Sequence, residues 1–207
     1  MNIPVVYEDN WLLAVDKPSG LLTIPAPKKQ TRTLLKILND DLKNRGLVYR
    51  LHPCHRLDRN TSGIIILSKG KSIQKAMMQA FKERKINKTY FAFVNGKLLK
   101  GQGIIRNPVG GRPAVTRYQV IQRFPDFTAV RIQPLTGRKN QIRRHFKQIG
   151  YPIIGDDRFA FRRDFKIRAK RLCLHAQGLS FCHPVTGKTI CLETELPEYF
   201  KQLSLTK

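Results

Sequence analysis

The hydrophobic positions of this chain change their period several times, which predicts a mixture of strands and helices. Short runs rich in β-branched and aromatic residues, bounded by turn residues, are typical of strands. Such runs occur at these positions: 5–7, 11–15, 64–67, 88–94, 116–124, 128–134, 172–181 and 188–196. Several strands follow one another directly, so the pattern favours an α+β fold over a strictly alternating, doubly wound one.

Apolar residues at helical spacing predict helices between these strands. The predicted helices are one capped by Thr31 with Leu34, Leu38 and Leu42 on one face, one over 71–84, one around Ile142, Phe146 and Ile149, and a short one after Pro197. In the strand at 88–94 the period of two places Tyr90, Ala92 and Val94 on one side and Phe91 and Phe93 on the other.

The charge of the chain indicates a polyanionic partner. Lysine and arginine total 39 against 14 acidic residues, a formal charge of +25, and the basic residues are spread along all 207 positions. Such a surplus suits a protein that displaces counterions from phosphates, so structured RNA is the expected partner. No basic block adjoins an amphipathic or lipidated terminus, no apolar run spans a bilayer and no signal peptide is evident, so we expect a cytoplasmic protein without membrane contact. No protein partner is implied.

The cysteines and histidines do not indicate a metal site. The four cysteines form no C-x-x-C pair, and the cluster of His52, Cys54 and His55 has a spacing unlike common zinc sites. The sequence therefore predicts neither a metal nor another cofactor.

One carboxylate, Asp58, lies among cationic side chains in a chain with few acidic residues. It follows Pro53 and precedes the buried strand predicted at 64–67, so it is expected on a loop at the mouth of the core, where a substrate can reach it. Alternatively, Asp58 caps a turn or pairs with Arg56 or Arg59, as an isolated Asp beside Arg usually does.

A second candidate, Arg143, adjoins the core-facing Ile142 in a predicted helix. A buried Asp58 would need such a guanidinium, because an unpaired buried carboxylate is costly and an arginine fork supplies two charge-assisted bonds. The periodicity alone is equally consistent with Arg143 and Arg144 as exposed phosphate contacts.

The block from His55 to Gly63 resembles the catalytic signature of the RluA-type pseudouridine synthases. Further blocks agree in family order: Lys17-Pro18-Ser19-Gly20, Lys88-x-Tyr90, Leu135-Thr136-Gly137-Arg138, Gln141-Ile142-Arg143, Pro152-Ile153-Ile154-Gly155-Asp156, Leu172-x-Leu174-His175-Ala176 and His183-Pro184. Two positions depart from the pattern. Asn140 replaces a usual His, which puts the local geometry in doubt, and the basic Arg144 replaces a common apolar residue.

The resemblance implies a pseudouridine synthase catalytic fold, with a large mixed and mainly antiparallel sheet flanked by helices and an active-site cleft across it. It implies a cofactor-independent isomerase that converts specific uridines in structured ribosomal or transfer RNA to pseudouridine. The implied catalytic residues are Asp58, Tyr90 and Arg143. Arg56 is expected to enter the RNA stack and Leu174 to pack against the flipped base; the remaining substrate-binding residues are Leu57, Thr61, Ser62 and Gly63.

We expect one catalytic domain over residues 1–207 without an appended N-terminal RNA-binding domain. Two other classes of protein compete with this interpretation. A non-catalytic RNA-binding protein, such as a ribosome-assembly factor, predicts a damaged catalytic set, whereas Asp58, Tyr90 and Arg143 are all present. A DNA-binding regulator would need a recognition helix, and none is evident.

Overall fold

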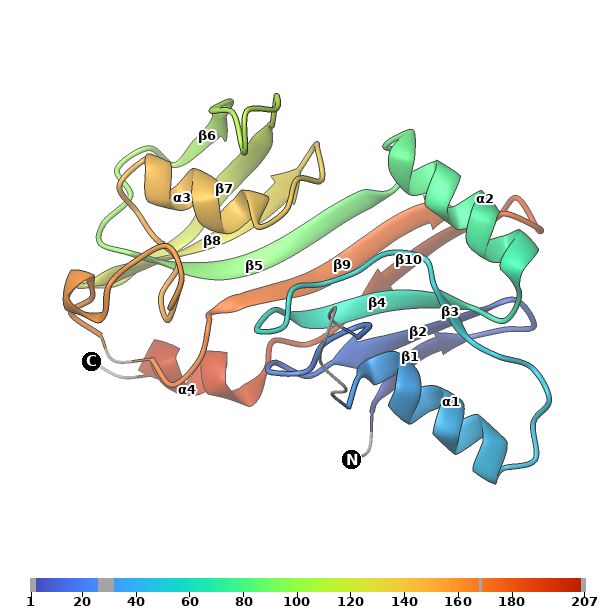
Figure 1. Ribbon diagram of the computed structural model, residues 1–207. Coiled ribbons are helices and arrows are strands. Elements are labelled where there is room, and N and C mark those ends of the chain that lie inside the picture. Colours follow the sequence, from blue (N-terminus) through green and yellow to red (C-terminus); the bar gives the residue numbers. More distant parts are fainter. Residues whose placement is uncertain (1–2, 26–31, 168, 206–207) are drawn as a thin grey trace. The chain divides into compact units, whose positions relative to one another are not determined.

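The computed structural model describes residues 3–25, 32–167 and 169–205 (Figure 1). The chain divides into two compact units. Unit 1 consists of Met1–Ile86 and Gly178–Thr194, and unit 2 consists of Asn87–Gln177 and Glu195–Lys207. Strand β9 (Leu174–Cys182) begins in unit 2 and ends in unit 1.

Unit 1 contains antiparallel strands and two helices (Figure 1). Its elements are β1 (Val5–Glu8), β2 (Leu12–Lys17), α1 (Leu34–Asn44), β3 (His52–Pro53), β4 (Ser62–Ser68), α2 (Lys71–Lys82) and β10 (Thr189–Glu193). β2 lies between β1 and β4, β3 also pairs with β4, and β10 pairs with the last part of β9. The strands predicted at 5–7 and 11–15 are therefore confirmed as β1 and β2, which pair as an antiparallel hairpin.

Helix α2, predicted over 71–84, covers one face of these strands with its apolar side. Met77 is fully buried, and it shares an apolar cluster with Leu12, Ala14, Ile64 and Ile66 of β2 and β4. Complete burial of such side chains is worth about 1.5–3 kcal/mol each, so this cluster holds β4 firmly in place. The loop of Asp58 leads directly into that strand.

The N-cap of α1 differs from the expected one. Thr31 lies outside the described residues, and the cap is Thr33, whose hydroxyl accepts a hydrogen bond from the Lys36 N–H at 3.2 Å. Thr33 has the extended backbone of an N-cap, whereas Leu34 is the first helical residue. Two threonines so close together could not be distinguished by sequence, because helix ends are uncertain by one or two residues.

Unit 2 contains a sheet of antiparallel strands in the order β5-β8-β7-β6. Its elements are β5 (Asn87–Asn95), β6 (Gln102–Ile105), β7 (Thr116–Arg123), β8 (Phe127–Pro134), α3 (Gln141–Gln148), a 3₁₀ turn (Arg162–Asp164) and α4 (Glu198–Leu205). Strands β3 and β6 had not been predicted. Each is too short to establish a period.

The two faces of β5 are buried by different helices. Ala92 and Val94 belong to the apolar cluster that contains Ile142 and Phe146 of α3. The alternate residues, Phe91 and Phe93, pack with Phe200 of α4, whose ring centroid lies 5.3 Å from that of Phe93. The predicted alternation along this strand is thus confirmed, and it puts Tyr90 on the α3 side.

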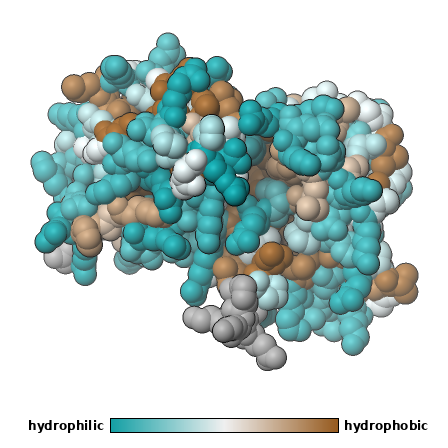
Figure 2. All heavy atoms as spheres, turned by 45° about the horizontal axis from the view of Figure 1, so that its top comes forward, coloured by the Kyte–Doolittle hydropathy of each residue, from teal (hydrophilic) through white to brown (hydrophobic). Residues whose placement is uncertain are grey.

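Both units combine antiparallel strands with separate helices, so the α+β class is confirmed. Hydrophilic side chains occupy most of the face shown in Figure 2. None of the helices in the described part of the chain has the length and apolar character that a membrane span requires.

We expect His175 to make unit 2 sensitive to mild acid. This residue of β9 is fully buried. Burial, aided by the charge of Arg171, lowers the pKa of its imidazole to about 4, although a hydrogen bond to the Glu195 backbone opposes the shift. The unfolded chain then binds a proton at a higher pH than the folded one, so stability is complete above pH 6.5 and is lost as the pH falls toward 4. The expected loss is up to about 3 kcal/mol.

Denaturant unfolding at several pH values measures this loss. His175→Asn removes the titrating group, so its free energy of unfolding should change less than that of the wild type between pH 6.5 and 4. Burial also lowers the pKa of His145, which remains in both proteins. Its contribution to the pH dependence is therefore the same in both curves and cancels in the comparison. Parallel pH curves for variant and wild type would show that His175 does not titrate in this window.

Candidate active site

Asp58 lies on the loop between β3 and β4, as predicted, and its side chain is half-buried. The preceding Leu57 is buried, and the buried Thr23 hydroxyl bonds to both its N–H and its carbonyl, at 3.3 and 3.2 Å. The Asp58 carbonyl accepts a hydrogen bond from the Thr61 N–H at 3.1 Å. The backbone is thus fixed on both sides of the carboxylate.

Lys17, at the end of β2, also fixes this loop. Its ammonium group is completely buried and donates hydrogen bonds to the carbonyls of Pro18, Leu21 and Arg59, at 2.9, 2.9 and 3.2 Å. A buried lysine is rare, and here carbonyl oxygens replace its hydration shell. Lys17 belongs to the Lys17-Pro18-Ser19-Gly20 block of the family resemblance, which by itself implies no role for this residue.

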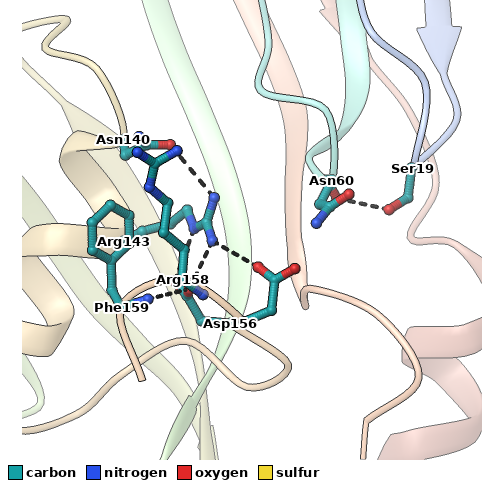
Figure 3. Close-up of polar contacts among 8 residues, drawn as sticks. Ser19, Asn60, Asn140, Arg143, Asp156, Arg158 and Phe159 are labelled. Carbon is teal, nitrogen blue, oxygen red and sulfur yellow. Dashed lines mark hydrogen bonds and ion pairs between the residues drawn. The ribbon is translucent and has the colours of Figure 1, made fainter. Parts of the chain in front are cut away.

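The segment after Lys17 adds further contacts. Ser19 donates its hydroxyl hydrogen to the Asn60 carbonyl at 2.7 Å (Figure 3), and the Gly20 N–H donates to the Arg59 carbonyl at 2.9 Å. In return, Arg59 Nε donates to the Gly20 carbonyl at 3.0 Å. The Arg59 side chain thus binds a backbone carbonyl. Among the described residues, Asp58 forms no ion pair with Arg56 or with Arg59.

The other residues of the motif have different surroundings. Arg56 is exposed, whereas Thr61 and Ser62 are buried. His55 Nε2 accepts a hydrogen bond from the Ile66 N–H at 3.0 Å, which ties the start of the loop to β4. Gly63 has φ of +114°, a conformation that other residues rarely adopt, so a side chain there would strain the entry into β4.

We expect Lys17→Met to destabilise the fold and also to slow catalysis by the folded protein. The substitution keeps the length of the side chain but leaves three carbonyl oxygens without their donor. The expected loss is about 1–3 kcal/mol in the free energy of unfolding. Because the same contacts hold the Asp58 loop, turnover should fall even at temperatures where the variant is folded.

The matched control is Lys36→Met, which removes an exposed ammonium that is paired with Asp40. Surface pairs of this kind contribute little, so this variant should unfold like the wild type. Denaturant unfolding and single-turnover rates on one RNA measure both effects. Equal stability of the two variants would exclude the proposed role of Lys17.

Tyr90 and Leu174 both contribute to unit 2. Tyr90, in β5, is half-buried and packs against the cluster that contains Ile142 and Phe146. Leu174, at the start of β9, belongs to the same cluster and is 3% exposed. The two residues therefore adjoin the same apolar core, and that core orients the Tyr90 ring.

Arg143 lies on α3 and is 5% exposed. Its Nε and Nη2 donate to the two carboxylate oxygens of Asp156, at 2.8 and 2.7 Å (Figure 3). Nη2 also lies 3.3 Å from the Asp157 carboxylate. We had expected the fork of Arg143 to pair with Asp58. The Nε–Nη2 edge pairs with Asp156 instead, and a contact between Asp58 and Arg143 stays a prediction, because the two residues belong to different units.

Asp156 ends the Pro152-Ile153-Ile154-Gly155-Asp156 block that resembles the family. It is 2% exposed, and its Oδ1 also accepts the backbone N–H groups of Arg158 and Phe159, at 2.9 and 3.0 Å. Burial raises the pKa of its carboxyl, but the hydrogen bonds from Arg143 and from the two N–H groups outweigh burial and hold that pKa below its ordinary value. Asp156 is therefore an ionised anchor for Arg143.

The loop of Asp156 is fixed by β5 and by Gly155. The Ile154 N–H donates to the Phe93 carbonyl at 2.9 Å, so this segment extends the sheet beside β5. Gly155 has φ of +74°, and a Cβ atom at this position would collide with the Arg171 carbonyl oxygen. Only glycine fits there, and its backbone turns the chain so that Asp156 reaches α3.

The departure from the family pattern at Asn140 is compatible with the fold. Asn140 precedes α3 with φ of +54° and ψ of +29°, the left-handed conformation that asparagine tolerates better than most residues. Its side-chain oxygen accepts from Arg143 Nη1 at 3.4 Å (Figure 3). Asn140 thus supports the guanidinium from the side opposite to Asp156.

The next residue, Gln141, connects α3 to β7. Its side-chain oxygen accepts from the Thr136 hydroxyl and the Arg138 N–H, at 2.7 and 3.0 Å. Its amide nitrogen donates to the Val115 carbonyl and the Thr116 hydroxyl, at 3.0 and 2.9 Å. Gln141 therefore fixes the start of the helix that carries Arg143.

Residues 11–148 match the model of the RNA pseudouridylate synthase family. The chain belongs to this family. The synthase is 35% identical to the dual-specificity RNA pseudouridine synthase RluA of Haemophilus influenzae, over 91% of this chain and 90% of the relative. It is 34% identical to the ribosomal large subunit pseudouridine synthase C of Vibrio vulnificus, over 96% of this chain and 67% of the relative.

Among solved structures, human RNA pseudouridylate synthase domain containing 4 matches with a TM-score of 0.79 and 24% identity, over 96% of this chain and 90% of that chain. This likeness confirms the pseudouridine synthase fold. The family membership confirms that the synthase is an isomerase that converts uridine in RNA to pseudouridine, and it favours catalysis over the non-catalytic RNA-binding alternative.

Proposed function

We propose that the synthase modifies specific uridines in structured ribosomal or transfer RNA and that Asp58, Tyr90 and Arg143 are its catalytic residues. The reaction breaks the bond between ribose C1′ and base N1, joins C1′ to C5 of the same base and moves the C5 proton to N1 through the active site. The atoms balance without an external reactant.

The roles of the residues follow the family resemblance. Asp58 attacks the nucleotide or removes a proton from it, Tyr90 stacks on the base, and Arg143 is the cation expected to act beside Asp58. A uridine stacked in RNA cannot react in place, so it must leave the stack. Arg56 then enters the gap in the RNA, and Leu174 packs against the extruded base.

The observation that carries this proposal is the construction of the Asp58 loop. A half-buried carboxylate lies between two backbone anchors, the Thr23 hydroxyl and the buried Lys17 ammonium. Placement of a reactive group on a rigidly held loop reduces the entropy lost on reaching the transition state.

A map of pseudouridines in total RNA from cells with and without this gene tests the proposal. The sites that disappear identify the RNA and the uridine. Restoration by the wild-type gene, but not by a gene that encodes Asp58→Asn, is the expected result. Unchanged maps of ribosomal and transfer RNA would refute the proposed substrates.

Arg56→Ala should lower turnover on a structured RNA without a comparable change in the salt dependence of binding. Each phosphate contact adds roughly 0.7–0.9 to the slope of log affinity against log salt, and an intercalating side chain contributes little to that slope. The loss of turnover should shrink on an RNA whose target uridine is already unpaired, because extrusion then costs less.

Turnover of Arg56→Ala on a paired and an unpaired substrate, together with a salt titration of binding, measures both effects. The exposed Arg59 is unsuitable as a control because it holds the Gly20 carbonyl. Arg45→Ala, at the exposed end of α1, removes the same charge elsewhere in unit 1. An equal loss on both substrates with a slope lower by about one unit would make Arg56 a phosphate contact.

A further inference from the structure

Three guanidinium groups surround one aromatic ring in unit 2. The Cζ atoms of Arg144, Arg143 and Arg158 lie 5.0, 5.1 and 5.6 Å from the centroid of the Phe159 ring. Arg143 and Arg144 are neighbours on α3, whereas Arg158 and Phe159 follow Asp156 on the next loop. Figure 3 shows Arg143 and Phe159 beside each other, with the Arg158 side chain extending toward Asn140.

Among the described residues, Arg143 is the one of these three cations with an acidic partner. Asp156 and Asp157 both bind Arg143. Arg144 and Arg158 form no ion pair with any residue in the ranges 3–25, 32–167 and 169–205, and the buried Nε of Arg144 has no hydrogen-bond partner there. The cluster thus retains a local excess of positive charge and an unused donor.

Backbone contacts fix the loop that carries Arg158 and Phe159, and they do not involve the guanidinium groups of Arg144 and Arg158. Asp156 Oδ1 accepts the N–H groups of Arg158 and Phe159, so the carboxylate that holds Arg143 also sets the position of the ring. Stacking on an aromatic face is favourable for arginine and leaves the in-plane N–H donors exposed to a ligand. The two cations lie 5.0 and 5.6 Å from the same ring centroid, so they repel each other, and an anion bound to both would relieve that repulsion.

We propose that Arg144 and Arg158, which both lie against the Phe159 ring, form a clamp for one phosphate group of the RNA backbone. A guanidinium presents a planar fork that matches the oxygens of a phosphate, and two forks can share a single phosphate. The inference rests on the proposed function, because it takes RNA as the source of that phosphate. Arg143 takes no part in this contact, since its fork binds Asp156.

The test is a salt titration of RNA binding by the full chain, with Asp58→Asn as the common background so that no turnover occurs. Arg144→Leu and Arg158→Gln should each weaken binding several-fold and lower the salt slope by about one unit. Because both side chains bind the same phosphate, the double variant should lose little more slope than either single variant. Two separate contacts would instead lose about twice as much, which would overturn the clamp.

Two further variants separate the clamp from general charge. Arg163→Gln is the matched control, because this residue also stacks on an aromatic ring, Phe161, with Cζ 5.2 Å from its centroid. It should leave the salt slope unchanged. Phe159→Leu keeps every charge but removes the shared ring, so it should weaken binding and reduce the slope. Equal effects of the control and the clamp variants, or no effect of Phe159→Leu, would refute the proposal.

A titration with inorganic phosphate, followed by NMR of the arginine Nε–H signals, distinguishes the source of the anion. Signals of Arg144 and Arg158 that move with RNA but not with millimolar free phosphate support an RNA clamp. Equal saturation by free phosphate would assign the site to a free anion and overturn the RNA assignment. Pseudouridine formation by the wild type on the same RNA is measured separately. Absence of pseudouridine there would refute the proposed function, whereas the binding measurements alone test the clamp.

Discussion

Asp58→Asn should abolish pseudouridine formation and leave the fold and RNA binding almost intact. The substitution preserves the volume of the side chain and removes the group that attacks the nucleotide or takes its proton. Loss of a central catalytic group ordinarily lowers turnover by more than about a thousandfold. The carboxylate is half-buried and forms no ion pair among the described residues, so stability should change by less than about 0.5 kcal/mol.

Three measurements on the same preparation check this expectation: single-turnover rate, RNA affinity and denaturant unfolding. Asp40→Asn is the control, because it neutralises an exposed carboxylate of α1 that is paired with Lys36. It should leave all three quantities unchanged. A residual rate in Asp58→Asn above about one thousandth of the wild type would remove Asp58 from the centre of the reaction.

The parts of the fold with a clear hydrophobic period could be predicted from the sequence. The alternation along β5 put Tyr90 and Ala92 on one face, and the spacing of Ile142 and Phe146 predicted α3 and its buried side. Both periods reflect burial against a neighbouring element, which the sequence records directly. The short strands β3 and β6 show no hydrophobic period, because they are defined by hydrogen bonding to an adjacent strand and not by burial of alternate side chains.

The buried charges could not be predicted in the same way. Lys17 and Asp156 are charged residues, which are usually exposed. The surrounding carbonyl and guanidinium groups offset the free-energy cost of removing these charges from water. Those groups come from distant parts of the chain: the Arg59 carbonyl for Lys17 and the α3 residue Arg143 for Asp156. The sequence offered Arg143 as a partner for a buried Asp58 or, equally, as an exposed phosphate contact, and it did not single out Asp156 as the carboxylate that the fork of Arg143 binds.

Arg143→Ala should destabilise the synthase by about 3–5 kcal/mol, because it leaves the Asp156 carboxylate buried without a counter-charge. Arg143→Lys keeps the charge but loses the two-pronged contact, so it should be intermediate. The pH dependence provides an independent check. The lowered pKa of Asp156 gives the wild type stability that is complete above about pH 4 and is lost as the pH falls through that pKa. This acid-dependent loss should be much smaller in Arg143→Ala.

A double-mutant cycle with Asp156→Asn separates the ion pair from other effects of Arg143. If the pair accounts for the loss, the double variant should be more stable than Arg143→Ala alone, because no unpaired carboxylate remains. Rates measured at a temperature where each variant is folded then report on catalysis alone. A further loss of turnover there would support the assignment of Arg143 to the reaction. Unchanged unfolding of Arg143→Ala with weaker RNA binding would instead make Arg143 a phosphate contact, and the buried pair with Asp156 would then contribute nothing to stability.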